Sequence, residues 1–176
     1  KENVANVKQT LEDAGIDFFA FGAHCKVLVK PSLVEEKGKE YKAWLELAHT
    51  HEVPYIRFQM DSGGMPKIWP PFPDFSQEEW SEYNAQIDKA IELVRPSMER
   101  LEEMLDDYEV TVGLETHGSF SSNYIFHEKF EKEFQHDKYE WIFDIGNFQN
   151  EDMRFKSLDL LKDNICYLHA ASRKYN

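Results

Sequence analysis

The feature that most constrains the fold is a regular alternation of short apolar runs with longer amphipathic stretches. Five runs have the length of strands, and they cover residues 16–23, 54–60, 110–118, 140–144 and 164–169. Apolar residues at helical spacing precede the first run and separate the later ones, as is typical of amphipathic helices. No hairpin signal joins two runs. The alternation therefore predicts an α/β fold in which parallel strands are joined by crossover helices outside the sheet.

Two features mark the stretch between the second and third runs. Ser76 and Glu79 have the spacing of a capping box, which predicts the start of a long helix. Pro96 lies inside this helix, so we expect a kink or a split near Arg95. Before the helix, four prolines between residues 65 and 75 exclude regular structure. A rigid connector and a lid beside a pocket are equally good interpretations of that segment.

Composition excludes several kinds of partner. The net charge of −13 argues against a nucleic-acid or anionic membrane surface. Cys25 and Cys166 are isolated, which favours a reducing compartment over disulfide or zinc chemistry. No apolar run is long enough to span a membrane, so we expect a cytoplasmic protein and no membrane partner. A homo-oligomer is compatible with these observations.

The length of 176 residues suffices for one domain with its own core, and we expect one domain over residues 1–176. The chain begins with Lys1 inside a helical pattern and ends just after a strand-like run. From these two ends we expect the chain to be part of a longer protein.

The third run combines an apolar face with a polar tip. Because side chains alternate between the faces of a strand, Val112 and Leu114 share one face, whereas Gly113, Glu115 and His117 share the other. The first face is apolar enough to pack under helices. The second ends in a carboxylate next to an imidazole.

Other runs repeat this arrangement, with Arg57, Asp144 and His169 on the polar faces of their strands. Ligand sites of β/α barrels and open α/β sheets lie at the C-terminal ends of the strands. We therefore expect these three side chains to converge with Glu115 and His117. Taken singly, each could be a turn or core residue satisfied by a neighbour, but equivalent positions on successive strands favour a site. Carboxylate oxygen and imidazole nitrogen suit Mn²⁺, Co²⁺, Zn²⁺ or Mg²⁺.

Other chemically active side chains rank lower. His24 lies just past the first run and is a weaker candidate for the pocket. Alternation along the fifth run places Cys166 on its apolar face. His127 and His136 lie in a charged helical stretch, and we expect both to be solvated.

Four segments resemble strands of the sugar phosphate isomerase/epimerase family, which are xylose isomerase-like TIM barrels. Residues 113–117 (GLETH) resemble a Gly-x-Glu-Asn-His strand, and residues 143–147 (FDIGN) resemble an Asp-x-Gly-Asn strand end. Residues 167–169 (YLH) resemble a strand ending in a metal-binding histidine, and residues 53–57 (VPYIR) a strand whose arginine faces the pocket. The resemblance implies a partial (β/α)8 TIM barrel of about five parallel strands with outer helices.

The resemblance also implies roles for individual residues. Glu115, Asp144 and His169 match three of the family's four ligands to a divalent metal ion, and Glu115 also matches a catalytic acid/base. Positions that would bind substrate oxygens are Arg57, His117 and Asn147. The chain stops before the family's fourth ligand, a glutamate that is also the second acid/base. Thr116 replaces the usual asparagine.

The implied activity is the metal-dependent isomerisation or epimerisation of a small sugar or polyol, by proton transfer through a metal-stabilised enediolate. Dehydration would use the same intermediate. Two other interpretations remain open. One is a non-catalytic sugar-binding or assembly subunit with a degenerate barrel. The other is an endonuclease IV-like nuclease, which needs a basic DNA-binding face that the acidic composition disfavours.

Overall fold

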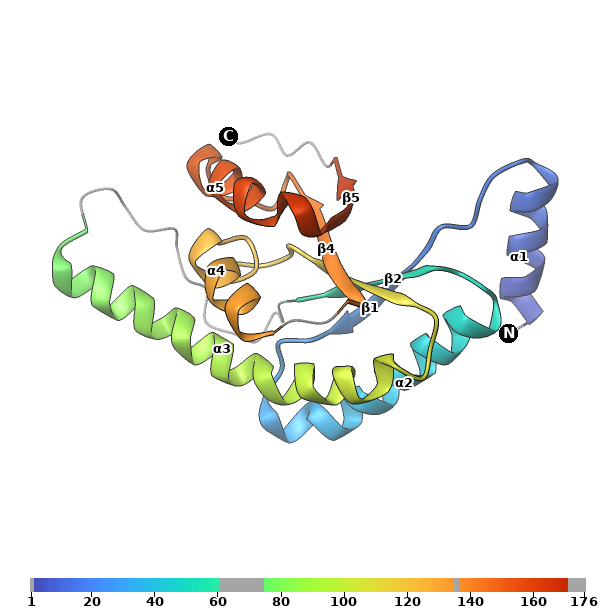
Figure 1. Cartoon of the computed structure of the whole chain (residues 1–176), viewed down its shortest axis with the longest axis horizontal. Helices are drawn as coiled ribbons and strands as arrows, with labels where there is room; N and C mark the ends of the chain where they lie inside the picture. The colour runs from blue at the N-terminus through green and yellow to red at the C-terminus, as the bar shows by residue number, and fades with distance from the viewer. Residues whose placement is uncertain (1, 61–74, 135–136, 171–176) are drawn as a thin grey trace.

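The computed structural model describes residues 2–60, 75–134 and 137–170, and its strands form one parallel sheet in sequential order (Figure 1). The strands are β1 (Ala20–Lys26), β2 (Tyr55–Gln59), β3 (Thr111–Glu115), β4 (Tyr139–Asp144) and β5 (Ile165–His169). Every neighbouring pair is parallel. This is the strand order of a TIM barrel, and the fold is the partial α/β barrel that the alternation and the motifs predicted.

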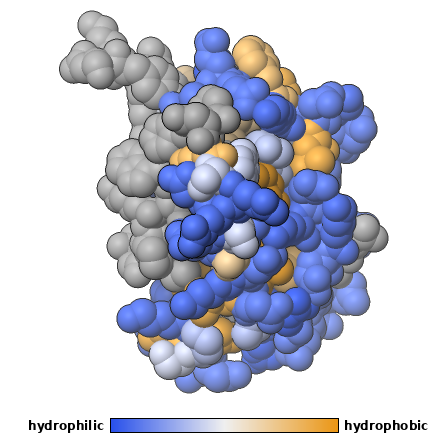
Figure 2. All heavy atoms as spheres, turned by 90° about the vertical axis from the view of Figure 1, so that its left-hand side faces the viewer, coloured by the Kyte–Doolittle hydropathy of each residue, from blue (hydrophilic) through white to orange (hydrophobic). Residues whose placement is uncertain are grey.

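The helices that connect successive strands cover one face of the sheet, and a further helix precedes the first strand. They are α1 (Glu2–Asp13), α2 (Val34–Thr50), α3 (Gln77–Leu105), α4 (Tyr124–Glu133) and α5 (Glu151–Leu161), with short 3-10 turns η1 (Pro31–Leu33) and η2 (Lys162–Asn164). Helices α2 to α5 pack against one another in chain order (Figure 1). The side of the molecule shown in Figure 2 is mostly hydrophilic, with small apolar groups between charged side chains.

The core lies between the sheet and helices α2 to α5, where the apolar faces of the strands meet the helices. Val112, Leu114 and Trp141 are fully buried on this side, together with Ile56 and Phe58. Each such side chain contributes roughly 1.5–3 kcal/mol on burial. The other face of the sheet is the barrel interior, which carries the polar strand ends.

Helix α3 begins as predicted but is not split. Ser76 Oγ accepts a hydrogen bond from Glu79 N at 3.3 Å, and Glu79 Oε2 accepts one from Ser76 N at 2.7 Å, which completes the capping box. The helix then runs through Pro96 without interruption (Figure 1). Val94 and Met98, on either side of the proline, are fully buried. Their packing against the core offsets the hydrogen bond that proline cannot make.

Strand β1 lies about four residues later than the predicted run of 16–23. It pairs with β2 from Ala20 onward, opposite Tyr55, and its side chains alternate between buried and exposed. The prediction placed Phe19 inside the strand because it belongs to the apolar run. Its ring is 46% exposed, and the residue lies outside the strand. As a consequence His24 lies within β1, on its exposed face, and not beyond it.

Two predictions fall on residues outside the described ranges. They concern residues 65–74 of the proline-rich segment and His136. Among the helices of the described ranges, none has the length and hydrophobicity that a membrane crossing requires.

Candidate metal centre

Three potential ligands meet where β3, β4 and β5 end. They are Glu115, Asp144 and His169, each the last residue of its strand, and their ligand atoms all lie within 4.8 Å of one another. The register explains the meeting, because Asp144 pairs directly with His169 and Glu115 lies opposite Ile142. Asp144, two residues after Ile142, therefore projects from the same face as Glu115.

The Glu115 carboxylate is the centre of the cluster. It is 3% exposed, and its Oε1 lies 2.8 Å from His169 Nδ1. Its Oε2 lies 3.0 Å from Arg57 Nε. The Arg57 contact is an ion pair that is not aligned as a hydrogen bond. The guanidinium thus compensates the charge of a buried carboxylate, while Oε2 has no hydrogen-bond donor among the described residues.

Asp144 is held by the turn that follows β4. Its Oδ1 accepts a hydrogen bond from Gly146 N at 2.8 Å, and its backbone oxygen accepts one from Asn147 N at 3.2 Å. Its own backbone N–H donates to Thr116 Oγ1 at 2.9 Å. These contacts fix the carboxylate at the end of the strand, at 8% exposure.

The three side chains fit a divalent cation. The two carboxylates are hard ligands and the imidazole is a borderline ligand. Mn²⁺, Zn²⁺ and related ions bind ligands of both types. Ligand atoms at about 2.0–2.2 Å from one ion lie at most about 4.4 Å apart, so a cluster within 4.8 Å needs only a small contraction. Because Oε2 of Glu115 accepts no hydrogen bond from the described residues, it is the buried atom that a cation would satisfy.

The predicted substrate-binding residues lie around this cluster but differ in their contact with it. Arg57 touches Glu115 directly. His117 is half-buried and donates its backbone N–H to Glu115 O at 2.7 Å. Asn147 is half-buried in the turn after Asp144. The structure thus brings Arg57 into the site, whereas His117 and Asn147 flank it.

Aromatic rings that were not predicted as site residues share the interior face. The ring of Phe19 lies 4.7 Å from that of Tyr55 and 5.5 Å from that of Tyr167. Tyr167 in turn lies 5.5 Å from the His169 ring. Burial raises the pKa of Tyr167 to about 12, so this phenol stays protonated. The sequence feature that could have indicated Tyr167 as a site residue is its position two residues before His169.

Cys166 lies on the opposite face from the predicted one, because β5 contains a bulge. Trp141 pairs with Ile165 and Ile142 with Tyr167, which leaves Cys166 as the extra residue. Bulges re-aim side chains in this way. The Cys166 Sγ therefore points to the interior, 3.5 Å from the place of a Cβ on Gly113. Burial raises its pKa to about 12, so Cys166 stays a thiol and not a thiolate ligand.

His127 is buried, contrary to the prediction that it is solvated. It lies on the face of α4 that meets the core, with its Nε2 2.8 Å from Ser121 O and its ring 4.8 Å from that of Trp141. Burial lowers its pKa to about 4, so the ring is neutral. The contact ties α4 to residues 116–123, the segment that follows Glu115.

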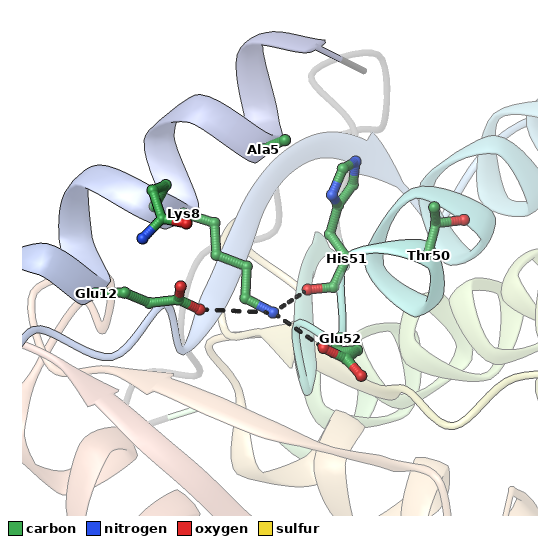
Figure 3. Close-up of a pocket in the computed structure, with 7 residues that line it drawn as sticks. Ala5, Lys8, Glu12, Thr50, His51 and Glu52 are labelled. Carbon is green, nitrogen blue, oxygen red and sulfur yellow. Dashed lines mark hydrogen bonds and ion pairs between the residues drawn. The ribbon is translucent and has the colours of Figure 1, made fainter.

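A separate pocket lies between α1 and the C-terminal end of α2 (Figure 3). Lys8 Nζ donates to His51 O at 2.8 Å and lies 3.3 Å from Glu52 Oε2 and 3.9 Å from Glu12 Oε1. Oxygen atoms thus already surround this ammonium group, which leaves it poorly suited to bind an anion. The contacts of Lys8 in this pocket attach α1 to the C-terminal end of α2.

The whole chain, residues 1–176, matches the family described as xylose isomerase-like TIM barrel. No curated protein matches it. Among solved structures, mannonate dehydratase from Streptococcus suis serotype2 is similar at 13% identity, with a TM-score of 0.65 over 96% of this chain and 60% of that one. A xylose isomerase-like TIM barrel protein from Mycobacterium smegmatis in complex with magnesium is similar at 15% identity, with a TM-score of 0.61 over 100% and 58%.

A third similar structure is the D-allulose 3-epimerase from Methylomonas sp. in complex with D-allulose. It shares 17% identity, with a TM-score of 0.59 over 94% of this chain and 56% of that one. This chain therefore spans between 56% and 60% of the length of these three structures. At such identities the structures show the fold, and the family match covers every residue. The chain thus belongs to the xylose isomerase-like TIM barrel family, as the resemblance of its motifs predicted.

Proposed function

We propose that this chain carries the metal site of a divalent-metal-dependent sugar or polyol isomerase or epimerase. The observation that carries the proposal is the meeting of Glu115, Asp144 and His169 at three strand ends, with ligand atoms within 4.8 Å of one another. The similar structures support it, since one is an epimerase with bound D-allulose, one is a mannonate dehydratase and one contains magnesium. We further propose that residues 1–176 form one partial barrel domain.

A divalent ion bound by these side chains would act as a Lewis acid toward a carbonyl and a neighbouring hydroxyl oxygen of the substrate. Glu115 is the candidate acid/base because its carboxylate lies in the cluster at the C-terminal ends of the strands. Arg57 holds Oε2 of that carboxylate in place. Its remaining N–H groups are suited to donate hydrogen bonds to substrate oxygens. His117 and Asn147 flank the cluster and are the next candidates to orient the substrate.

Glu115 accounts for proton transfer on one face of the substrate carbon. Epimerisation also needs an acid/base on the other face. Within the described residues, only Glu115 and Asp144 contribute carboxylates to the cluster, and Asp144 serves as a ligand. The complete reaction is therefore a proposal for the whole protein, whereas proton exchange at one face is proposed for this chain.

Metal binding is tested first, by titrating the purified chain with Mn²⁺ in a calorimeter. We expect one site in the wild type and at least about 100-fold weaker binding in Asp144→Asn. Asp163→Asn is the matched control, because Asp163 is exposed and lies outside the cluster. Equal Mn²⁺ affinity in wild type and Asp144→Asn would refute the metal site.

Proton transfer is tested with D-allulose in D₂O containing Mn²⁺, by following deuterium incorporation next to the carbonyl by NMR. We expect incorporation with the wild type and none above background with Glu115→Gln. Metal binding without any exchange would favour the non-catalytic binding protein instead.

A further inference from the structure

Thr116 joins the ends of the two strands that carry the carboxylates. It follows Glu115 directly and is fully buried. Its backbone N–H donates to Ile142 O at 3.0 Å, and its Oγ1 accepts from Asp144 N at 2.9 Å. One residue thus contacts β4 on both sides of Phe143, once through its backbone and once through its side chain.

The side-chain contact replaces a bond of the regular ladder. After Thr116 N donates to Ile142 O, the next bond of a parallel ladder would run from Asp144 N to Thr116 O. The chain turns too sharply for that bond, because His117 N donates back to Glu115 O at 2.7 Å, as in a γ-turn. Thr116 O accepts from Ser122 Oγ at 3.3 Å instead. The hydroxyl therefore takes the place of the carbonyl and extends the pairing by one residue, to Asp144.

We propose that Thr116 is a positioning residue of the metal site, whose hydroxyl sets the spacing between the carboxylates of Glu115 and Asp144. The inference rests on the proposed metal site. Glu115 is joined covalently to Thr116, and Asp144 is joined to it by a buried hydrogen bond. Without the hydroxyl, Asp144 N loses the acceptor that it has among the described residues, and the end of β4 is free to move away from β3.

The hydrogen bond distinguishes three substitutions. Valine matches the shape of threonine but removes the acceptor, and it is not a conservative exchange for that reason. Serine keeps the acceptor and loses only a methyl group. Ser157→Ala is the control for the loss of a buried hydroxyl, because Ser157 is fully buried on α5 and is not in the cluster.

The experiment measures Mn²⁺ affinity by calorimetry and amide hydrogen exchange by NMR in the same variants. We expect Thr116→Val to bind Mn²⁺ about 10–100-fold more weakly than wild type, whereas the affinities of Thr116→Ser and Ser157→Ala should change by less than about threefold, well below that range. In Thr116→Val the Asp144 amide should exchange faster, while the Val112 amide, which donates to Lys138 O at 2.8 Å, stays protected. That internal comparison separates local release of β4 from global unfolding.

Three results would count against these ideas in different ways. If the wild type binds no Mn²⁺, the metal site itself is wrong, and the inference falls with it. If the wild type binds and Thr116→Val binds equally well, the metal site stands and only the role of Thr116 is refuted. If Thr116→Val does not fold, Thr116→Ser decides the matter. Loss of affinity in the serine variant, which keeps the oxygen, would also refute the inference.

Discussion

The Nδ1 of His169 lies 2.8 Å from the Oε1 of Glu115, although 54 positions separate the two residues in the chain. Both atoms are candidate metal ligands, and their contact joins the ends of β3 and β5. Arg57 forms an ion pair with the second oxygen of the same carboxylate but donates no hydrogen bond to it. The two contacts position the Glu115 carboxylate between β2 and β5.

The Arg57 ion pair should matter for stability as well as for chemistry. Arg57→Met leaves the buried Glu115 carboxylate without its cation, at a cost of about 3–5 kcal/mol in the free energy of unfolding. Arg154→Met is the control, since the exposed pair with Glu151 should cost less than about 1 kcal/mol. Urea denaturation measures both values. Equal losses in the two variants would show that the Glu115 pair has no special role.

The interior face of β3 has no room for a side chain at Gly113. A Cβ there would lie 2.5 Å from Ile142 Cδ1, so Gly113→Ala should destabilise the protein by about 1–3 kcal/mol. Gly22→Ala is the matched control, because its nearest neighbour would be Arg57 Nη1 at 3.8 Å.

Combining Gly113→Ala with Ile142→Ala should give a loss smaller than the sum of the two single losses, since the new methyl group fills part of the cavity. Thermal denaturation of the four chains measures this coupling. Strict additivity would mean that Ile142 does not limit the space at Gly113.

His127 should make stability depend on pH. Its pKa is lowered from 6.5 to about 4 in the folded protein because the ring is buried, so the unfolded chain binds a proton that the folded chain excludes. Stability is therefore lost as pH falls through 6.5 toward 4, by about 2 kcal/mol between about pH 7 and about pH 5.

Urea denaturation at the two pH values should show this loss in the wild type and a smaller one in His127→Phe. His24→Gln is the control for removing a histidine, since His24 is exposed on β1. The same loss in His127→Phe as in the wild type would assign it to other groups.

Much of the fold was predictable because its signals are local. The apolar runs, the capping box at Ser76 and the alternation along β3 each depend on neighbours within a few residues, and the parallel order followed from them. The meeting of Glu115, Asp144 and His169 was predictable for a related reason. Parallel strands present their C-terminal ends at one edge, so equivalent positions converge whatever the connecting helices contain.

The errors arose where a distant partner decides the outcome. Cys166 faces the interior because β5 gains a bulge against β4, and alternation within one strand cannot reveal a slip in register. His127 is buried because its ring packs against Trp141 and its Nε2 donates a hydrogen bond to the backbone oxygen of Ser121, although its neighbours in the chain are charged. Of the two effects predicted for Pro96, a kink or a split, the split does not occur, because core packing keeps α3 one helix.

The central claim is that His169, Glu115 and Asp144 bind one divalent ion. Electron spin echo measurements on the Mn²⁺-loaded chain test it most directly, because a bound imidazole nitrogen couples to the electron spin of the metal. We predict a nitrogen coupling in the wild type that is lost in His169→Gln and retained in His24→Gln. Bound Mn²⁺ without nitrogen coupling, or a coupling that survives in His169→Gln, would contradict the proposed site.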